Sequence, residues 1–93
     1  MRIVHHPTFS KELKNILRYI ANDKPSASIQ FKNELKKRIN DLVAQPYQCR
    51  PSFYFDDINI RDMIFKKYTI VYEVNIDNDT IEIIRIFNRN KPD

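Results

Sequence analysis

The sequence contains no glycine, a single cysteine and no apolar run long enough to cross a bilayer. The absence of glycine excludes P-loops and dinucleotide-binding loops, whose backbones need glycine where they approach a phosphate. Turns that require a positive φ must therefore use residues such as Asn or Asp. The lone Cys49 excludes an internal disulfide framework and a multi-cysteine zinc site.

The length and charge of the chain are informative as well. Its 93 residues are enough for one domain, which we place at residues 1–93, and no linker or repeat divides them. The first residues do not resemble a signal peptide, so we expect a cytoplasmic protein. A net charge of +4 and a pI near 9.3 favour an anionic partner, either a nucleic acid or an acidic protein.

Two stretches have the apolar spacing of amphipathic helices. The first apolar set is Phe9, Leu13, Ile16, Leu17 and Ile20. The second is Ala27, Phe31, Leu35, Ile39 and Leu42. Thr8 or Ser10 is the expected N-cap of the first helix, and Pro25 and Pro46 bound the second. The short connector predicts an antiparallel helical hairpin, with the lysines of the second helix on a solvated face.

The remaining apolar segments read as strands. Residues 2–6 are a short candidate, and residues 58–65, 68–76 and 80–89 are longer ones with alternating side chains. Strict alternation in the last strand places Ile81, Ile83 and Phe87 on one face and Ile84 and Ile86 on the other. The order β-α-α-β-β-β predicts an α+β fold, with an N-terminal helical hairpin packed on a twisted, mostly antiparallel sheet.

The side chains that most often carry chemistry do not form a convincing site. His5 and His6 are adjacent, so they point to opposite faces of a strand, and Cys49 has no obvious base beside it. Asp56 and Asp57 lie in an expected loop, where capping or solvation explains them. We therefore expect no metal, no cofactor and no catalytic residue assigned from these groups.

Cations carried by the strands are the more informative set: Arg61, Lys66, Lys67, Arg85 and Arg89. An unpaired arginine inside an apolar strand is costly. Two alternatives follow. Either these groups pair with acidic residues such as Asp62, Glu73 and Glu82, or they line a face that binds an anion.

Three segments taken together resemble the RelE/ParE superfamily of bacterial toxins: a helical hairpin, then "NIRDMIFKKYTIVYEV", then "IEIIRIFNRNKP". The resemblance implies the toxin of a type II toxin–antitoxin system, bound and neutralised by a cognate acidic antitoxin. It also implies that the cations of the sheet bind the cellular target. These are Arg61, Lys66, Lys67, Arg85, Arg89 and Lys91.

The superfamily contains two activities. RelE-like members cleave mRNA on the ribosome without a metal, and ParE-like members poison DNA gyrase. Arg61 and Arg89 match the nuclease pattern, and they are the residues implied to act if this chain is a nuclease. Thr69 stands where these nucleases commonly have Arg, Asn88 where they often have His, and the sequence closes at Asp93 without the terminal Tyr. The resemblance thus favours a non-enzymatic gyrase poison. The alternatives are a ribosome-dependent endoribonuclease and, third, a non-toxic nucleic-acid-binding module.

Overall fold

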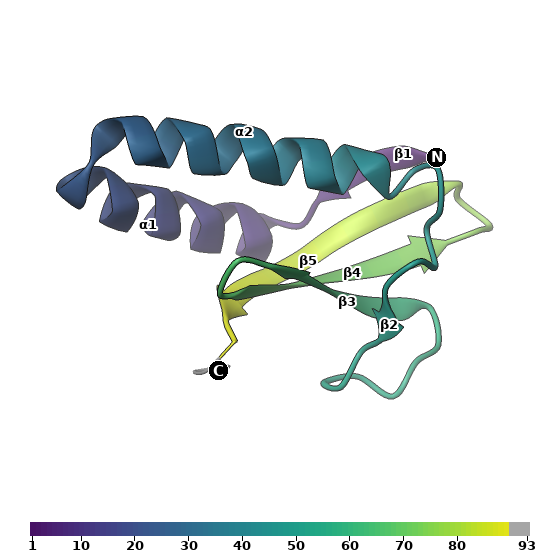
Figure 1. Cartoon of the computed structure of the whole chain (residues 1–93). Coiled ribbons are helices and arrows are strands. Elements are labelled where there is room, and N and C mark those ends of the chain that lie inside the picture. The colour runs from purple at the N-terminus through teal and green to yellow at the C-terminus, as the bar shows by residue number, and fades with distance from the viewer. Residues whose placement is uncertain (90–93) are drawn as a thin grey trace.

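A computed structural model describes residues 1–89 of the chain. It contains two helices and five strands: β1 (Arg2–His5), α1 (Pro7–Asp23), α2 (Pro25–Asp41), β2 (Arg50–Pro51), β3 (Ile60–Phe65), β4 (Tyr68–Asn75) and β5 (Thr80–Asn88). Both helices lie over one face of the sheet, which gives two layers (Figure 1). The predicted α+β class and element order are confirmed, and the two-residue strand β2 is an addition that the sequence did not indicate.

The five strands form one sheet in the order β1-β5-β4-β3-β2. β1 runs parallel to β5, and all other neighbours are antiparallel. The hairpin β3–β4 turns at Lys66, which has a φ of 53°. This conformation is usually left to Gly or Asn, and a chain without glycine adopts it here with a lysine.

The helical hairpin is formed by caps that the sequence only partly predicts. The N-cap of α1 is His6, whose Nδ1 accepts a hydrogen bond from the Thr8 amide at 3.1 Å. The expected caps Thr8 and Ser10 are wrong because the helix already begins at Pro7. Lys24 alone connects the helices in an extended conformation, and Pro25 then occupies the first turn of α2. The Ser28 hydroxyl donates to the carbonyl of Leu17 at 2.7 Å, which ties the two helices together.

The core lies between the helices and the facing side of the sheet. Its helical part consists of the buried residues Phe9, Phe31, Leu35, Ile39 and Leu42. Its sheet part consists of Met63, Phe65, Tyr68, Ile70, Tyr72, Val74, Ile81, Ile83 and Ile86. The helical stripes are therefore confirmed, and so is the alternation predicted for β4 from Tyr68 to Val74. Ile76, expected on the same face, instead follows the end of the strand and is 62% exposed.

One part of the predicted alternation in β5 is wrong. Val71 pairs with Arg85 while Tyr72 pairs with Ile83, so Ile84 is an extra residue at a β-bulge. The bulge returns Ile86 to the core face with Ile81 and Ile83. Phe87 packs instead against Tyr54, with ring centroids 5.1 Å apart.

Candidate functional site

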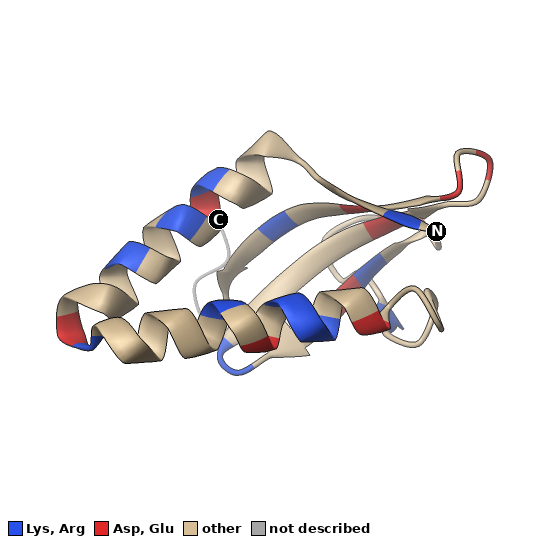
Figure 2. Ribbon diagram, turned by 90° about the horizontal axis from the view of Figure 1, so that it is seen from above, with Lys and Arg blue, Asp and Glu red and all other residues tan. Residues whose placement is uncertain are grey.

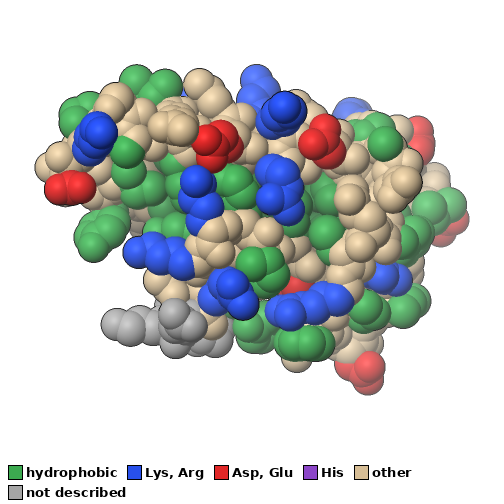
Figure 3. Space-filling view, in the orientation of Figure 1, with side chains coloured by type: hydrophobic (Ala, Val, Ile, Leu, Met, Phe, Trp, Pro, Cys, Tyr) green, Lys and Arg blue, Asp and Glu red, His purple; other side chains and the backbone are tan. Residues whose placement is uncertain are grey.

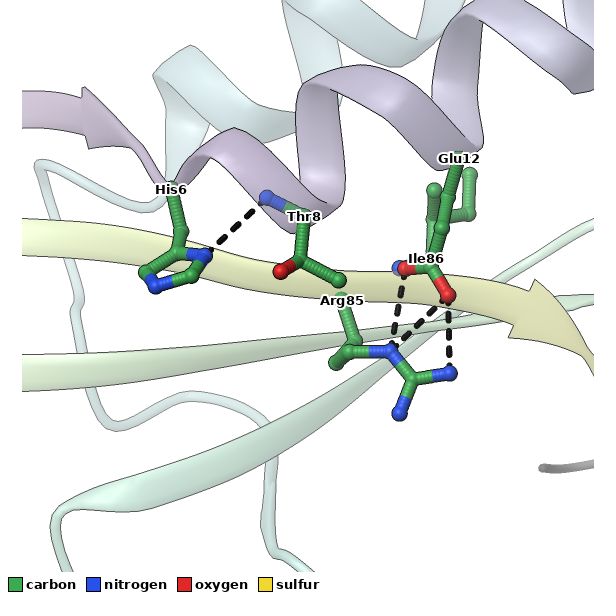
Figure 4. A network of polar contacts seen from close by, with 5 residues as sticks. All are labelled: His6, Thr8, Glu12, Arg85 and Ile86. Atoms are coloured by element: carbon green, nitrogen blue, oxygen red, sulfur yellow. Dashed lines mark hydrogen bonds and ion pairs between the residues drawn. The ribbon is translucent and has the colours of Figure 1, made fainter.

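Arg85 is paired with a helix residue that the sequence did not identify. Its Nε lies 3.0 and 2.9 Å from the two carboxylate oxygens of Glu12, and its Nη2 lies 2.7 Å from Oε2 (Figure 4). The same carboxylate accepts the amide of Ile86 at 3.0 Å. β1 pairs with β5 only as far as Ile83. Just beyond that point, the Glu12 carboxylate provides the hydrogen-bond acceptor that a neighbouring strand would otherwise supply to the Ile86 amide. Arg85 thus joins α1 to the sheet, and its predicted role in target binding stays a prediction.

Arg61 holds the segment between α2 and β3. Its Nε donates to the carbonyl of Ile58 at 2.9 Å, and its Nη1 donates to those of Cys49 and Tyr47 at 2.9 and 3.4 Å. The guanidinium also lies over the Tyr47 ring, 4.8 Å from its centroid. These contacts give Arg61 a visible structural role in addition to any contact with a target.

The other strand cations gather at the opposite end of β3. Lys66 and Lys67 form the exposed β3–β4 turn, and the Arg89 amide donates to the carbonyl of Lys67 at 2.8 Å. Lys66 Nζ lies 3.1 Å from Glu34 on α2. On the face of the molecule drawn in Figure 3, lysine and arginine side chains are spread between α2 and the strands below it. We call Lys66, Lys67 and Arg89 the cationic turn. Lys91, the remaining predicted cation, lies outside the described residues.

Tyrosine side chains border the cationic turn. Lys67 Nζ lies 6.0 Å from the centroid of the Tyr68 ring. Burial and the nearby Tyr19 raise the pKa of the Tyr68 hydroxyl, so it stays protonated at neutral pH. Tyr19 itself is 70% exposed. The cationic turn therefore offers positive charge beside an exposed ring, a combination that suits an anionic partner.

The two arginines that match the nuclease pattern lie far apart on the sheet. Arg61 is opposite Tyr72, whereas Arg89 follows Asn88, which is opposite Tyr68. This offset along β4 corresponds to roughly 13 Å. A single phosphate held by both arginines would require Arg61 to leave its three carbonyl partners. Their assignment to RNA binding stays a prediction.

An apolar groove runs between α2 and the first part of the chain. Its volume is about 550 Å³, and the two helices diverge from their connector so that the sheet is visible between them (Figure 2). One wall comes from α2 and the other from β1 and α1. The lining residues are Ile3, His5, Phe9, Leu13, Lys32, Leu35, Lys36, Ile39 and Asn40.

Two lysines at the rim of this groove were read from the sequence as part of a solvated face. Lys32 and Lys36 are exposed, and within residues 1–89 neither takes part in an ion pair. Their i, i+4 spacing places both on the side of α2 that borders Leu35 and Ile39. The sequence could have shown from that spacing that the two lysines lie on one side of the helix. The groove beside them depends on the divergence of the helices, which only the structure shows.

The remaining candidate groups have structural contacts. His5 packs edge-on against Phe9, with centroids 5.2 Å apart, and His6 caps α1. Cys49 lies at the edge of the core next to Tyr72. Burial, followed by the Cys49 thiol, raises the pKa of the Tyr72 hydroxyl, which donates to the carbonyl of Pro46 at 2.7 Å. In the part of the chain that the structure describes, no three metal-binding side chains cluster, and neither helix could span a membrane.

Comparisons with known proteins bear on the family of the chain and on its fold. The family model described as the ParE toxin of the type II toxin–antitoxin system parDE matches residues 3–92. The chain is similar to a structure of the chromosomal ParDE system from P. aeruginosa, with a TM-score of 0.74, 18% identity and 95% of each chain covered. It is also similar to a structure of the intact E. coli RelBE toxin–antitoxin complex, with a TM-score of 0.66, 13% identity and 94% of each chain covered. No curated protein matches the sequence.

Proposed function

Because the chain belongs to the ParE family of type II toxins, we propose that it arrests growth by poisoning DNA gyrase and that a cognate antitoxin neutralises it. The family match over residues 3–92 carries this proposal. The chemistry of the sheet supports it. Thr69, in place of the nuclease arginine, is only 1% exposed, and the amide of Asn88 cannot transfer a proton at neutral pH.

A second candidate is a ribosome-dependent mRNA endoribonuclease. The cationic turn favours it, because the exposed Lys66 and Lys67 line one pocket with the Tyr19 ring, an arrangement that suits a phosphate backbone with an adjacent base. Such a nuclease would work by positioning the RNA and stabilising charge, since the described residues offer no well-placed acid and base pair.

The experiment that separates the two candidates is a pair of assays on one preparation. Purified protein is incubated with gyrase and supercoiled DNA, and covalently trapped cleavage complexes are counted. In parallel, the protein is added to translating ribosomes and the mRNA is mapped for new 5′ ends. Trapped complexes with intact mRNA are expected. Codon-periodic cuts without trapped complexes would instead establish the nuclease.

The apolar groove is the proposed contact site of the antitoxin. An amphipathic helix fits a groove lined by apolar side chains, and acidic residues beside its apolar face would meet Lys32 and Lys36. The lysines would then gain the partners that they lack among the described residues. The groove and the cationic turn are separate surfaces, so an antitoxin bound in the groove would neutralise the toxin without contacting every cation of the sheet.

A further inference from the structure

A short loop between β2 and β3 exposes an unusual amount of apolar surface. We call residues 52–58 the aromatic loop. It contains four large apolar side chains that face solvent: Phe53 (73% exposed), Tyr54 (42%), Phe55 (42%) and Ile58 (64%). Hydrophobic side chains gather along the lower right edge of the molecule, where this loop lies (Figures 1 and 3). Contiguous apolar surface of this kind commonly marks an interaction site.

Backbone and side-chain hydrogen bonds hold both ends of the aromatic loop. The Ser52 amide donates to the carbonyl of Ile60 at 2.8 Å. Asp57 accepts from the Asn59 amide at 2.9 Å through its side chain and from the Ile60 amide at 3.0 Å through its carbonyl. A loop ordered in advance loses little entropy when it binds, which favours affinity.

Phe53 in particular is held by charged groups. Its amide donates to Oδ2 of Asp62 at 3.0 Å, and the Asp62 side chain is completely buried. The guanidinium of Arg50 lies 3.8 Å from the centroid of the Phe53 ring. Burying a carboxylate is costly. Here Nη2 of Arg50 lies 3.6 Å from Oδ2 and offsets part of that cost. The pair fixes a loop whose Phe53 ring remains 73% exposed, so burial of this ring adds little to the stability of the isolated chain.

The charge of this region disfavours a nucleic acid as the natural occupant. Between residues 47 and 61, Arg50 and Arg61 are balanced by Asp56 and Asp57, so the net charge is zero. Arg50 and Arg61 are also engaged with rings and backbone carbonyls. Binding to a phosphate backbone depends on an excess of free cations, which the loop lacks.

Two protein occupants are disfavoured as well. An acidic antitoxin would be repelled by Asp56 and Asp57 at the tip of the loop. A second copy of the chain offers its own apolar groove with Lys32 and Lys36, but the loop lies below the sheet and the groove lies between the helices above it (Figures 1 and 2). A contact between loop and groove would be heterologous, whereas the commonest contact between identical chains is the isologous one of a two-fold dimer.

We propose that the aromatic loop inserts Phe53 and Ile58 into an apolar cleft with a basic rim on the target protein, with Asp56 meeting that rim. This assignment rests on the proposed function, in which the target is gyrase. It places the protein contact on the side of the sheet away from the helices, separate from the antitoxin groove. Aromatic side chains held in place are typical of the few residues that dominate a protein interface.

The test compares the double variant Phe53→Ala/Ile58→Ala with the matched control Ile29→Ala/Ile76→Ala. The control side chains are 64% and 62% exposed and lie outside the loop. Full-length proteins are passed over immobilised gyrase and, separately, over the cognate antitoxin. We expect the loop variant to bind gyrase at least tenfold more weakly, with unchanged antitoxin affinity and melting temperature, and the control to match the wild type in every measurement. The single variant Asp56→Lys should also weaken gyrase binding.

Several outcomes would overturn the assignment. Unchanged gyrase affinity in the loop variant would do so. The assignment would also fail if the loop variant bound gyrase normally but bound the antitoxin or an oligonucleotide more weakly. It would fail as well if the wild type self-associated and the loop variant did not. If the wild type traps cleavage complexes and the loop variant traps them equally well, only the loop assignment fails. A wild type that is inert toward gyrase would overturn the proposed function as well, so the two failures are distinguishable.

Discussion

Glu12 is a residue whose importance comes from its position at the edge of the sheet. One carboxylate binds the Arg85 guanidinium through two nitrogens and also accepts the Ile86 amide. The Glu12 and Arg85 side chains are only 23% and 24% exposed, so solvent screens the pair less than it would a surface ion pair. Removing the carboxylate leaves both a guanidinium and a backbone amide without this partner.

We therefore predict that Glu12→Ala lowers the free energy of unfolding by about 2 kcal/mol. The measurement is urea denaturation followed by circular dichroism. Glu34→Ala is the matched control, because Glu34 also pairs with one cation but lies in solvent with Lys66. A much smaller change is expected there. Equal losses in the two variants would show that the Glu12 contact contributes no more than a surface pair.

A second prediction at the residue scale separates stability from RNA binding. Arg61→Ala removes the donor of three backbone carbonyls and should lower the free energy of unfolding by about 2 kcal/mol. Arg89→Ala should leave stability close to that of the wild type, because Arg89 is exposed. Cleavage of mRNA is then measured per folded molecule. If the chain is a nuclease that uses both arginines, both variants slow cleavage, and wild-type rates in both would contradict that role.

At the scale of elements, the bulge in β5 shows where sequence reasoning was sufficient and where it was not. The helical stripes and the alternation of β4 follow directly from side-chain period, and both were predictable. In "IEIIRIF" five of the seven residues are apolar and they occupy both faces of the strand, so period two cannot reveal an extra residue. The bulge position depends on how β5 pairs with β4, which is a long-range property.

The same reasoning explains the other errors. A His N-cap before Pro7 is uncommon, so Thr8 and Ser10 were the better guesses from local preference. The pair Glu12–Arg85 joins residues 73 positions apart, and nearer acidic candidates were available. For the candidate site, the sequence supplied the cations but could not show that Arg61 and Arg85 have internal partners while Lys66 and Lys67 lie in solvent.

The bulge leads to a prediction about deletions. Ile84 is the extra residue, so deleting it would leave Ile83 opposite Tyr72 and Arg85 opposite Val71, as they are now. Deleting Glu82 instead would shift Ile81 out of register with Val74 and remove it from the core. We expect the Ile84 deletion to cost several kcal/mol less than the Glu82 deletion, since displacing a buried Ile costs about 2–5 kcal/mol. Denaturant unfolding of both variants checks this. A greater loss for the Ile84 deletion would mean that the bulge itself is required.

At the scale of the whole molecule, the two-layer fold separates three surfaces. The helices diverge above the sheet and leave the apolar groove beside Lys32 and Lys36. The cationic turn projects from one end of β3, and the aromatic loop lies beyond the other end, near Arg61. A small toxin can in this way present one surface to an inhibitor while others contact a target.

This separation predicts opposite effects of two variants that have the same charge change. Lys32→Glu/Lys36→Glu alters the rim of the groove and should weaken binding of the antitoxin about tenfold or more, because like charges would face each other. Toxicity should remain, so expressing the antitoxin should no longer rescue growth. Lys66→Glu/Lys67→Glu alters the cationic turn and should reduce toxicity while antitoxin binding stays close to that of the wild type.

Growth curves with and without the antitoxin, together with the affinity of the purified pair, measure both effects. Each variant serves as the control for the other, because both reverse two exposed lysines and change the net charge equally. If each variant lost both properties, net charge rather than position would govern the two interactions, or a single surface would serve both partners. The crossed result requires two sites. It would place the inhibitor between the helices, and it would make the cationic turn, together with the aromatic loop, part of the surface that contacts the target.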